Sequence, residues 1–160
     1  MEINKVLVLG AGTMGNGIVH VFAHSGYKVL MSDISKIALE KGLNTIKKNF
    51  ERQLKKGTIS QEAVDTALSN ISTTTNIEDA KDADLVVEAV SENKDLKFKI
   101  FRDLDERINT NAILASNTST ISITEIAANT KRPDKVIGMH FMNPVPMMKL
   151  VEVIEGLSTS

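Results

Sequence analysis

Glycines near the start of the chain form the pattern Gly10-x-Gly12-x-x-Gly15, directly after an apolar run and before a helical stretch. In such a loop the first glycine permits a tight turn, the second lets the backbone approach a pyrophosphate, and the third lets the helix pack closely on the strand. The first helical residues, Thr13 and Met14, then present unpaired N–H groups to the phosphates. The pattern predicts a dinucleotide site. The alternative is a strand-to-helix turn that merely needs glycines.

A carboxylate, Asp33, lies at the end of the next predicted strand. Its separation from Gly12 along the chain is close to the roughly 20 residues expected in a dinucleotide-binding unit. Asp33 can accept hydrogen bonds from both ribose hydroxyls, whereas its charge would repel a 2′-phosphate. This favours NAD over NADP, although Lys36 is near enough in sequence to soften the repulsion. Asp33 could instead cap the helix that begins near Ser35.

Histidine and glutamate suggest acid–base chemistry in the second half. His140 ends a predicted strand, and Glu152 lies in the next one, beyond a loop with two prolines. If the chain turns back at that loop, the carboxylate could face the imidazole, which exchanges a proton near neutral pH. Spacing alone leaves a structural role open for both. His20 and His24 are four apart on one helix, but no third metal ligand is evident, so we expect an ordinary helix face and no metal.

The elements that must position these residues alternate between strands and helices. We predict strands over residues 6–9, 27–31, 71–74, 85–89, 113–115, 136–141 and 150–154. We predict helices over residues 13–25, 35–57, 60–68 and 96–108, and a further helix from the capping box at 122–125. This alternation indicates a Rossmann-type, doubly wound α/β fold with a mostly parallel sheet, helices on both faces and ligands at the carboxyl ends of the strands.

Length, composition and net charge limit the class of protein. A length of 160 residues suits one folding unit, 1–160, and 42% hydrophobic with 24% charged residues is typical of a globular domain. A net charge of −1 provides no overall field to hold nucleic acid or an anionic membrane. The absence of cysteine excludes disulfides and thiolate metal sites. We see no signal peptide and no apolar run of membrane length, so we expect a cytoplasmic protein.

Together these residues resemble the 3-hydroxyacyl-CoA dehydrogenase family, and within it the bacterial 3-hydroxybutyryl-CoA dehydrogenases. The similarity covers essentially the whole chain, and the stretch from His140 to Glu152 is its most specific part. The segments that carry it are residues 10–15, 85–90 with Glu92, 115–119 and 140–153.

The resemblance implies a reaction and three catalytic residues. His140 would remove the proton of the substrate's 3-hydroxyl as hydride leaves C3 for the nicotinamide, and would return a proton in the reverse reduction. Glu152 would orient His140. Ser119 would hydrogen-bond the reacting oxygen, although its position also suits a turn hydroxyl.

The resemblance also implies binding residues. Asn143 would lie by the nicotinamide ribose, and Asn117, Glu92 and Lys97 would belong to the nicotinamide end of the NAD site. Without the resemblance, Glu92 and Lys97 would be interpreted as solvated charges. Lys56 matches the region that contacts coenzyme A in the family, but Lys-Lys-Gly also suits a plain helix end.

Relatives in this family continue into an all-helical second domain that completes the active site, closes over the acyl-CoA and forms a homodimer. That domain is absent from residues 1–160. We therefore expect a fragment that binds NAD(H) and turns over an acyl-CoA poorly without the helical domain. Two alternatives remain: a non-catalytic NAD-binding module, and a dehydrogenase of a small 3-hydroxy acid that lacks CoA.

Overall fold

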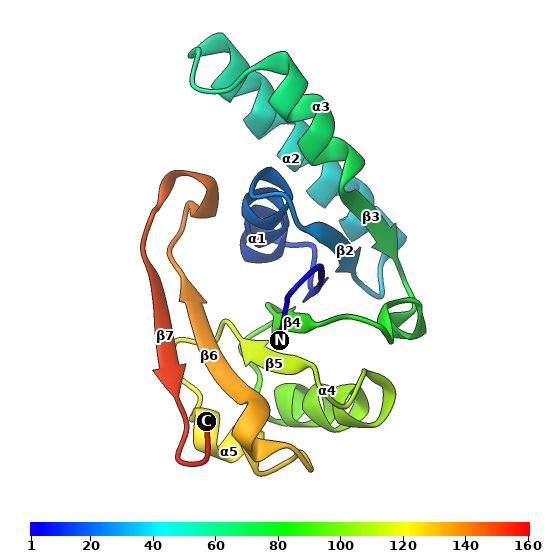
Figure 1. Ribbon diagram of the computed structural model, residues 1–160, viewed down its shortest axis with the longest axis vertical. Helices are drawn as coiled ribbons and strands as arrows, with labels where there is room; N and C mark the ends of the chain where they lie inside the picture. Colours follow the sequence, from blue (N-terminus) through cyan, green and yellow to red (C-terminus); the bar gives the residue numbers. More distant parts are fainter.

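One seven-stranded sheet, in the order β3-β2-β1-β4-β5-β6-β7, forms the centre of the computed structural model of residues 1–160 (Figure 1). Neighbouring strands are parallel except β6 and β7, which are antiparallel. The strands are β1 (Lys5–Leu9), β2 (Lys28–Ser32), β3 (Ile71–Thr74), β4 (Leu85–Glu88), β5 (Ile113–Ser116), β6 (Val136–Phe141) and β7 (Val151–Glu155). The predicted doubly wound α/β class is confirmed, with the strand order of a dinucleotide-binding sheet.

Helices cover both faces of the sheet. They are α1 (Thr13–His24), α2 (Lys36–Lys55), α3 (Gln61–Ser69), α4 (Lys94–Arg107) and α5 (Ile123–Ala127). Short 3₁₀ turns, absent from the prediction, are η1 (Ile77–Ala80), η2 (Pro133–Lys135) and η3 (Val145–Met147). The other boundaries lie within about two residues of those expected from sequence. Helix α4 begins earlier than predicted, at Lys94, because the Asn93 side chain caps it by accepting from the Leu96 N–H at 3.0 Å.

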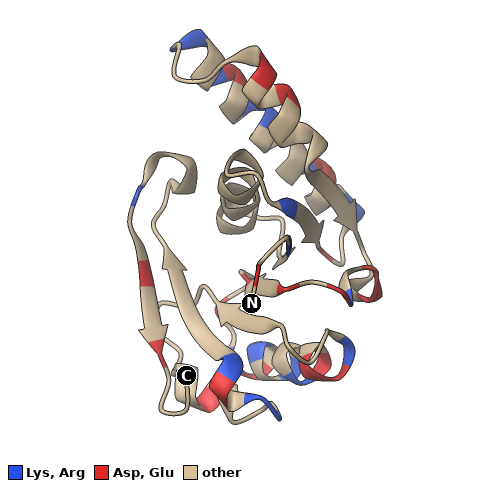
Figure 2. Cartoon of the chain, viewed as in Figure 1, with Lys and Arg blue, Asp and Glu red and all other residues tan.

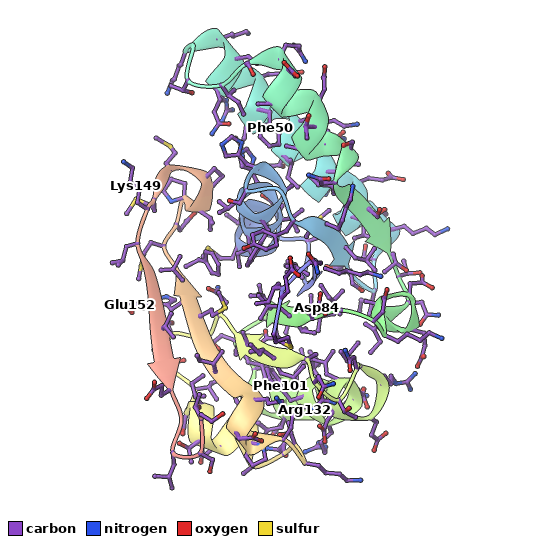
Figure 3. All side chains as sticks on the ribbon, in the orientation of Figure 1. Phe50, Asp84, Phe101, Arg132, Lys149 and Glu152 are labelled. Atoms are coloured by element: carbon purple, nitrogen blue, oxygen red, sulfur yellow. The ribbon has the colours of Figure 1, made fainter.

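Alternate residues of the strands enter two separate hydrophobic cores. Val6 and Val8 of β1 face α1, α2 and α3, where Phe50 is buried, whereas Leu7 faces α4 and α5, where Phe101 is buried. Figure 3 shows these two phenylalanines on opposite sides of the sheet. Because both faces are covered, the central strands are apolar throughout, as expected for parallel strands.

Charged residues lie mostly on the helices and at strand ends. Figure 2 shows acidic and basic residues interspersed on α2, α3 and α4, and few on the central strands. None of the helices combines the length and the apolar character that a membrane crossing requires.

The sheet has a topological switch point between β1 and β4. The chain leaves β1 for α1 on one face and leaves β4 for α4 on the other face. The carboxyl ends of these strands therefore diverge and leave a crevice, which is where open α/β sheets bind ligands. The β6–β7 hairpin closes one end of the crevice, and its η3 turn packs on α1 so closely that a methyl group at Gly17 would lie 2.8 Å from Val145 Cβ.

Candidate active site at the carboxyl edge of the sheet

The larger of two adjoining pockets, about 640 Å³, lies over the glycine loop. Gly10, Gly12 and Asp33 line one side of it, and residues of α4 line the other. Ala89 and Val90, which follow β4, line both this pocket and the smaller one. The two pockets therefore adjoin along the crevice, and together we call them the trench.

The glycines shape the loop as their spacing predicts. Gly10 has a φ of +104°, which residues with a Cβ rarely adopt, and a methyl group at Gly15 would lie only 1.8 Å from the Gly10 carbonyl oxygen. Gly12 differs, because a methyl group there would meet nothing within 4 Å. Its open side therefore leaves room for a ligand to approach the backbone.

The start of α1 has no side-chain cap. Gly12 occupies the N-cap position without a side-chain hydrogen bond, whereas Ser35, Ser60, Asn93 and Ser122 cap the other four helices. The first N–H groups of α1, at Thr13 and Met14, are free to bind phosphate oxygens. Together with the open face of Gly12, they fit a dinucleotide pyrophosphate.

Asp33 is held at the floor of the larger pocket. Its carboxylate accepts hydrogen bonds from the backbone N–H groups of Ala11, at 3.0 Å, and Ser35, at 2.9 Å. The helix cap is Ser35 itself, whose hydroxyl accepts from the Ala38 N–H, so the alternative role of Asp33 as the cap is wrong. A carboxylate has about four acceptor positions, so Asp33 keeps capacity for ribose hydroxyls.

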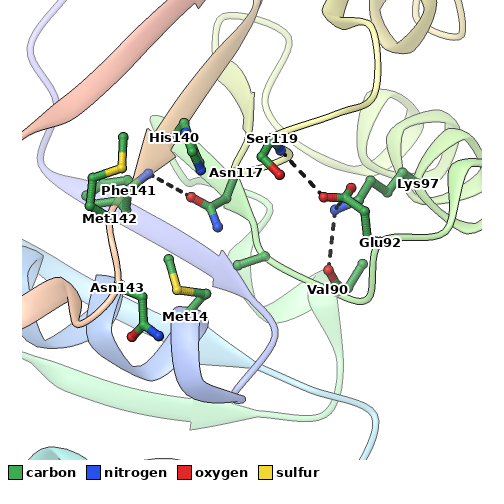
Figure 4. A pocket seen from close by; sticks show the side chains of 11 residues that line it. Met14, Val90, Glu92, Lys97, Asn117, Ser119, His140, Phe141, Met142 and Asn143 are labelled. Atoms are coloured by element: carbon green, nitrogen blue, oxygen red, sulfur yellow. Dashed lines mark hydrogen bonds and ion pairs between the residues drawn. The ribbon is translucent and has the colours of Figure 1, made fainter.

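The smaller pocket, about 290 Å³, lies at the other end of the trench (Figure 4). Side chains from α1, the β4–α4 loop, α4, the β5–α5 loop and the β6–η3 segment meet there. Its lining residues are Met14, Ala89, Val90, Glu92, Lys97, Asn117, Ser119, His140, Phe141, Met142 and Asn143. Seven of these are predicted site residues, so the fold gathers most of the predicted nicotinamide end in one place.

His140 and Glu152 face each other across the β6–β7 hairpin. They are directly paired residues of the antiparallel ladder, and His140 Nδ1 lies 3.2 Å from Glu152 Oε2. Because Nδ1 is engaged by the carboxylate, Nε2 is the ring nitrogen left to exchange a proton in the pocket. The chain does turn back at the proline loop, as the sequence argument required, and Figure 3 shows Glu152 on the outer strand.

A buried carboxylate that the sequence argument missed supports this pocket. Glu88, at the end of β4, is fully buried and accepts from Lys97 Nζ at 2.6 Å, from Ser116 Oγ at 2.6 Å and from the Val90 N–H at 2.8 Å. These contacts join β4, β5 and α4. An acidic residue that ends an otherwise apolar strand was the available signal, because a buried charge requires a partner.

Lys97 connects Glu88 to the pocket. Its side chain is 2% exposed, so the interpretation of Lys97 as a solvated charge is wrong. Besides Glu88, its Nζ donates to the Val90 carbonyl at 3.3 Å and lies 3.6 Å from Glu92 Oε1. Glu92 also accepts from Thr118 Oγ1 at 2.7 Å and from the Ser119 N–H at 3.5 Å. Ser119 is thereby attached to the β4–α4 loop.

Two asparagines, Asn117 and Asn143, line the same pocket as His140. Asn117 Oδ1 accepts from the Phe141 N–H at 2.8 Å, which fixes the backbone next to His140. Figure 4 shows the Asn117 amide nitrogen pointing toward Met14. Both residues can therefore offer polar atoms to a ligand beside the imidazole.

Two further residues singled out from the sequence line neither pocket: Lys56, a predicted coenzyme A contact, and His20, expected on an ordinary helix face. Lys56 is exposed at the C-cap of α2, a helix of 20 residues and therefore about 30 Å long, and it lines neither pocket. His20 is buried and stacks on Phe50 with ring centroids 3.9 Å apart. Burial lowers the pKa of His20 to about 4, with a smaller contribution from His24. No cluster of three potential metal ligands is present.

Comparison with known proteins gives consistent matches. Residues 5–160 match the family described as "3-hydroxyacyl-CoA dehydrogenase, NAD binding domain". The chain is 51% identical over 156 residues to the 3-hydroxybutyryl-CoA dehydrogenase of Clostridioides difficile, covering 98% of this chain and 56% of that protein. It is 49% identical over 160 residues to a probable 3-hydroxybutyryl-CoA dehydrogenase of Bacillus subtilis, covering 100% and 56%.

A solved structure agrees with the fold. The crystal structure of (S)-3-hydroxybutyryl-CoA dehydrogenase from Ralstonia eutropha has a TM-score of 0.97 and 48% identity, over 99% of this chain and 56% of that one. The chain thus spans somewhat more than half the length of these relatives. The predicted family resemblance and NAD as the cofactor are confirmed.

Proposed function

Because the chain belongs to the NAD-binding domain family of the 3-hydroxyacyl-CoA dehydrogenases, we propose that it is the cofactor-binding domain of a 3-hydroxybutyryl-CoA dehydrogenase. The proposed reaction interconverts (S)-3-hydroxybutyryl-CoA and acetoacetyl-CoA by hydride transfer with NAD(H). The observation that carries the proposal is the His140–Glu152 pair, with Nδ1 and Oε2 3.2 Å apart, in a pocket that adjoins the one over the glycine loop.

The trench sets the orientation that we propose for NAD. The larger pocket takes the adenosine, with Asp33 toward its ribose, and the pyrophosphate crosses the open face of Gly12 at the start of α1. The nicotinamide then occupies the smaller pocket beside His140, within reach of Asn143. The charge of Asp33 disfavours the 2′-phosphate of NADP.

The chain's own residues provide the acid–base part of the reaction. NAD, when bound, accepts the hydride that leaves C3 of the alcohol. His140 Nε2 takes the proton of the 3-hydroxyl, and the Glu152 carboxylate holds the ring orientation and stabilises its positive charge. Ser119, on the same wall of the pocket, hydrogen-bonds the reacting oxygen. In reduction the same groups return the proton.

Coenzyme A requires contacts outside the trench. We propose that Lys56, at the far end of α2, binds its phosphates, and that a helical domain beyond residue 160 covers the thioester and forms the homodimer. Exposed apolar side chains of β7 and its flanks support a partner on this edge. They are Leu150, Val153, Ile154 and Leu157, with exposed fractions of 58%, 62%, 39% and 88%. A cytoplasmic location stays a prediction.

The proposal is tested by mixing the protein with NADH and acetoacetyl-CoA, with and without a separately supplied helical domain of a relative. We expect NADH binding by the domain alone and slow NADH oxidation that rises by orders of magnitude with the helical domain, because an open, wet site stabilises the transition state poorly. Free acetoacetate serves as the comparison substrate and Lys56→Glu as the matched variant.

Each alternative gives a different result. Tight NADH binding without oxidation under either condition would indicate a non-catalytic module. Equal reduction of free acetoacetate and its thioester, unaffected by Lys56→Glu, would indicate an enzyme that acts on a small 3-hydroxy acid. Either result contradicts the proposed function.

A further inference from the structure

One wall of the smaller pocket carries charges that do not cancel. Two carboxylates, Glu88 and Glu92, share a single ammonium group, Lys97. Lys97 Nζ lies 2.6 Å from Glu88 but 3.6 Å from Glu92, and both Lys97 and Glu88 are almost fully buried. Glu88 is therefore the principal partner of Lys97, and their charges largely compensate each other.

Lys97 compensates the negative charge of Glu92 only weakly. The other contacts of Glu92 are neutral donors, the Thr118 hydroxyl and the Ser119 N–H, and 43% of its side chain is exposed. Of the other residues that line the pocket, only His140 is titratable, and Glu152 stands behind its ring. No second cation lines the pocket. The wall thus has a net negative charge.

The oxidised and reduced cofactors differ where this charge acts. The nicotinamide ring is positively charged in NAD⁺ and neutral in NADH, whereas the phosphates and riboses are the same in both. A charge on the pocket wall therefore affects the two forms unequally, whereas a lost hydrogen bond or a loosened loop affects both.

We propose that the Glu88–Lys97–Glu92 cluster sets the redox-state preference of the cofactor site and shifts it toward NAD⁺. The inference rests on the proposed placement of the nicotinamide in the smaller pocket. Glu88 acts as a positioning residue, because by compensating Lys97 it leaves the Glu92 charge available to the ring. A tenfold shift in relative affinity makes the bound couple more reducing by about 30 mV for two electrons.

The test compares the wild type with charge variants. The dissociation constant of NADH is measured by its fluorescence, and that of NAD⁺ by competition with NADH. Glu92→Gln should raise the ratio Kd(NAD⁺)/Kd(NADH) about three- to tenfold, the effect of one charge at about 6 Å in a partly solvated site. Glu88→Gln should raise the ratio as well, because Lys97 is then free to compensate Glu92. Lys97→Gln should lower it.

Glu125→Gln is the matched control, because Glu125 pairs with Lys94 on the surface and lines neither pocket. It should leave the ratio unchanged. Since Glu88 and Lys97 are buried, thermal unfolding checks that their variants fold. If they do not fold, the ratio measured for the more exposed Glu92→Gln alone tests the inference.

An equal change in both dissociation constants for Glu92→Gln, or a fall in the ratio, would overturn the inference while leaving the proposed cofactor site intact. Wild-type protein that binds neither NAD⁺ nor NADH would overturn the proposed function, and this inference with it.

Discussion

The two ends of the trench are built in different ways. One side of the larger pocket is shaped by backbone, since Gly10 and Gly15 allow the loop to turn and pack, and Gly12 leaves an open face. The smaller pocket is made of side chains from five separate parts of the chain, held by buried polar contacts such as Glu88 with Lys97.

This difference separates binding from chemistry. Under the proposed function, the backbone end recognises features that all dinucleotides share, the pyrophosphate and the ribose, and so fixes the ligand class. The side-chain end would then provide the proton-transfer groups that choose a reaction. Substitutions at the backbone end should therefore lower the affinity for the cofactor, whereas substitutions at the side-chain end should lower kcat.

The largest effect is expected at the side-chain end. His140→Gln should lower kcat for acetoacetyl-CoA reduction, measured with the helical domain supplied, by about 10²- to 10⁴-fold, because it removes the acid–base group. The Kd for NADH should stay within about twofold. Glu152→Gln should lose less, since the imidazole remains. A His140→Gln protein with wild-type kcat would exclude His140 as the proton-transfer group.

A pair of glycine variants tests the backbone end. Gly12→Ala should fold with a melting temperature close to that of the wild type, because its methyl group meets nothing within 4 Å. It should nevertheless weaken NADH binding about 10- to 100-fold, since that space is where we propose that the pyrophosphate passes. Gly15→Ala should instead unfold more easily by several kcal/mol, since its methyl group overlaps the Gly10 carbonyl. Unchanged NADH affinity in Gly12→Ala would place the ligand elsewhere.

Asp33 tests whether the larger pocket distinguishes NADH from NADPH. Asp33→Asn should improve NADPH binding relative to NADH about tenfold, because removing the charge removes repulsion of the 2′-phosphate. Asp103→Asn, on the α4 side of the same pocket, is the control for a charge change that does not contact the ribose. Fluorescence titrations with both nucleotides measure the effect, and equal changes in the two variants would argue against a specific role for Asp33.

The last effect is on stability, not on binding or catalysis, and it concerns His20 of α1, which lines neither pocket. His20 has a folded-state pKa of about 4 against an ordinary value of 6.5, so the unfolded chain binds the extra proton between these pH values. Stability should therefore fall as the pH drops from about 6.5 to about 4, by up to roughly 3 kcal/mol from this group. His20→Phe keeps an aromatic ring against Phe50 and should flatten this dependence in denaturant unfolding.

Two surface carboxyls, Asp82 and Asp84, should contribute equally to the pH dependence of stability in wild type and His20→Phe. Hydrogen bonds from Lys5 to Asp82, and from the Asn4 and Lys5 backbone N–H groups to Asp84, lower the pKa of each carboxyl below its ordinary value. Their contribution is lost only at more acidic pH and should be the same in both proteins. Parallel stability curves for wild type and His20→Phe above pH 4 would show that His20 is not the titrating group.

Local patterns were sufficient to predict the fold. Continuous apolar runs identified the strands, the capping box at Ser122 marked a helix start, and the glycine spacing located the larger pocket. The short 3₁₀ turns were missed because three or four residues carry too little periodic signal.

The smaller pocket could be predicted only in part. The pairing of His140 with Glu152 depends on the register of a hairpin, which residue types alone do not fix. Glu88 was missed and Lys97 was open to interpretation as a surface charge, because their partners come from separate elements and burial is a property of the assembled fold. The family resemblance supplied Lys97 where spacing did not, but it gave no role to Glu88.

The central claim is that one trench holds NAD with its nicotinamide beside His140. A crystal structure of the protein with NADH tests it most directly. We predict the adenosine ribose at Asp33, the pyrophosphate over Gly12 and the nicotinamide in the pocket lined by His140 and Asn143. A cofactor bound in the reverse direction, or outside the trench, would contradict the account.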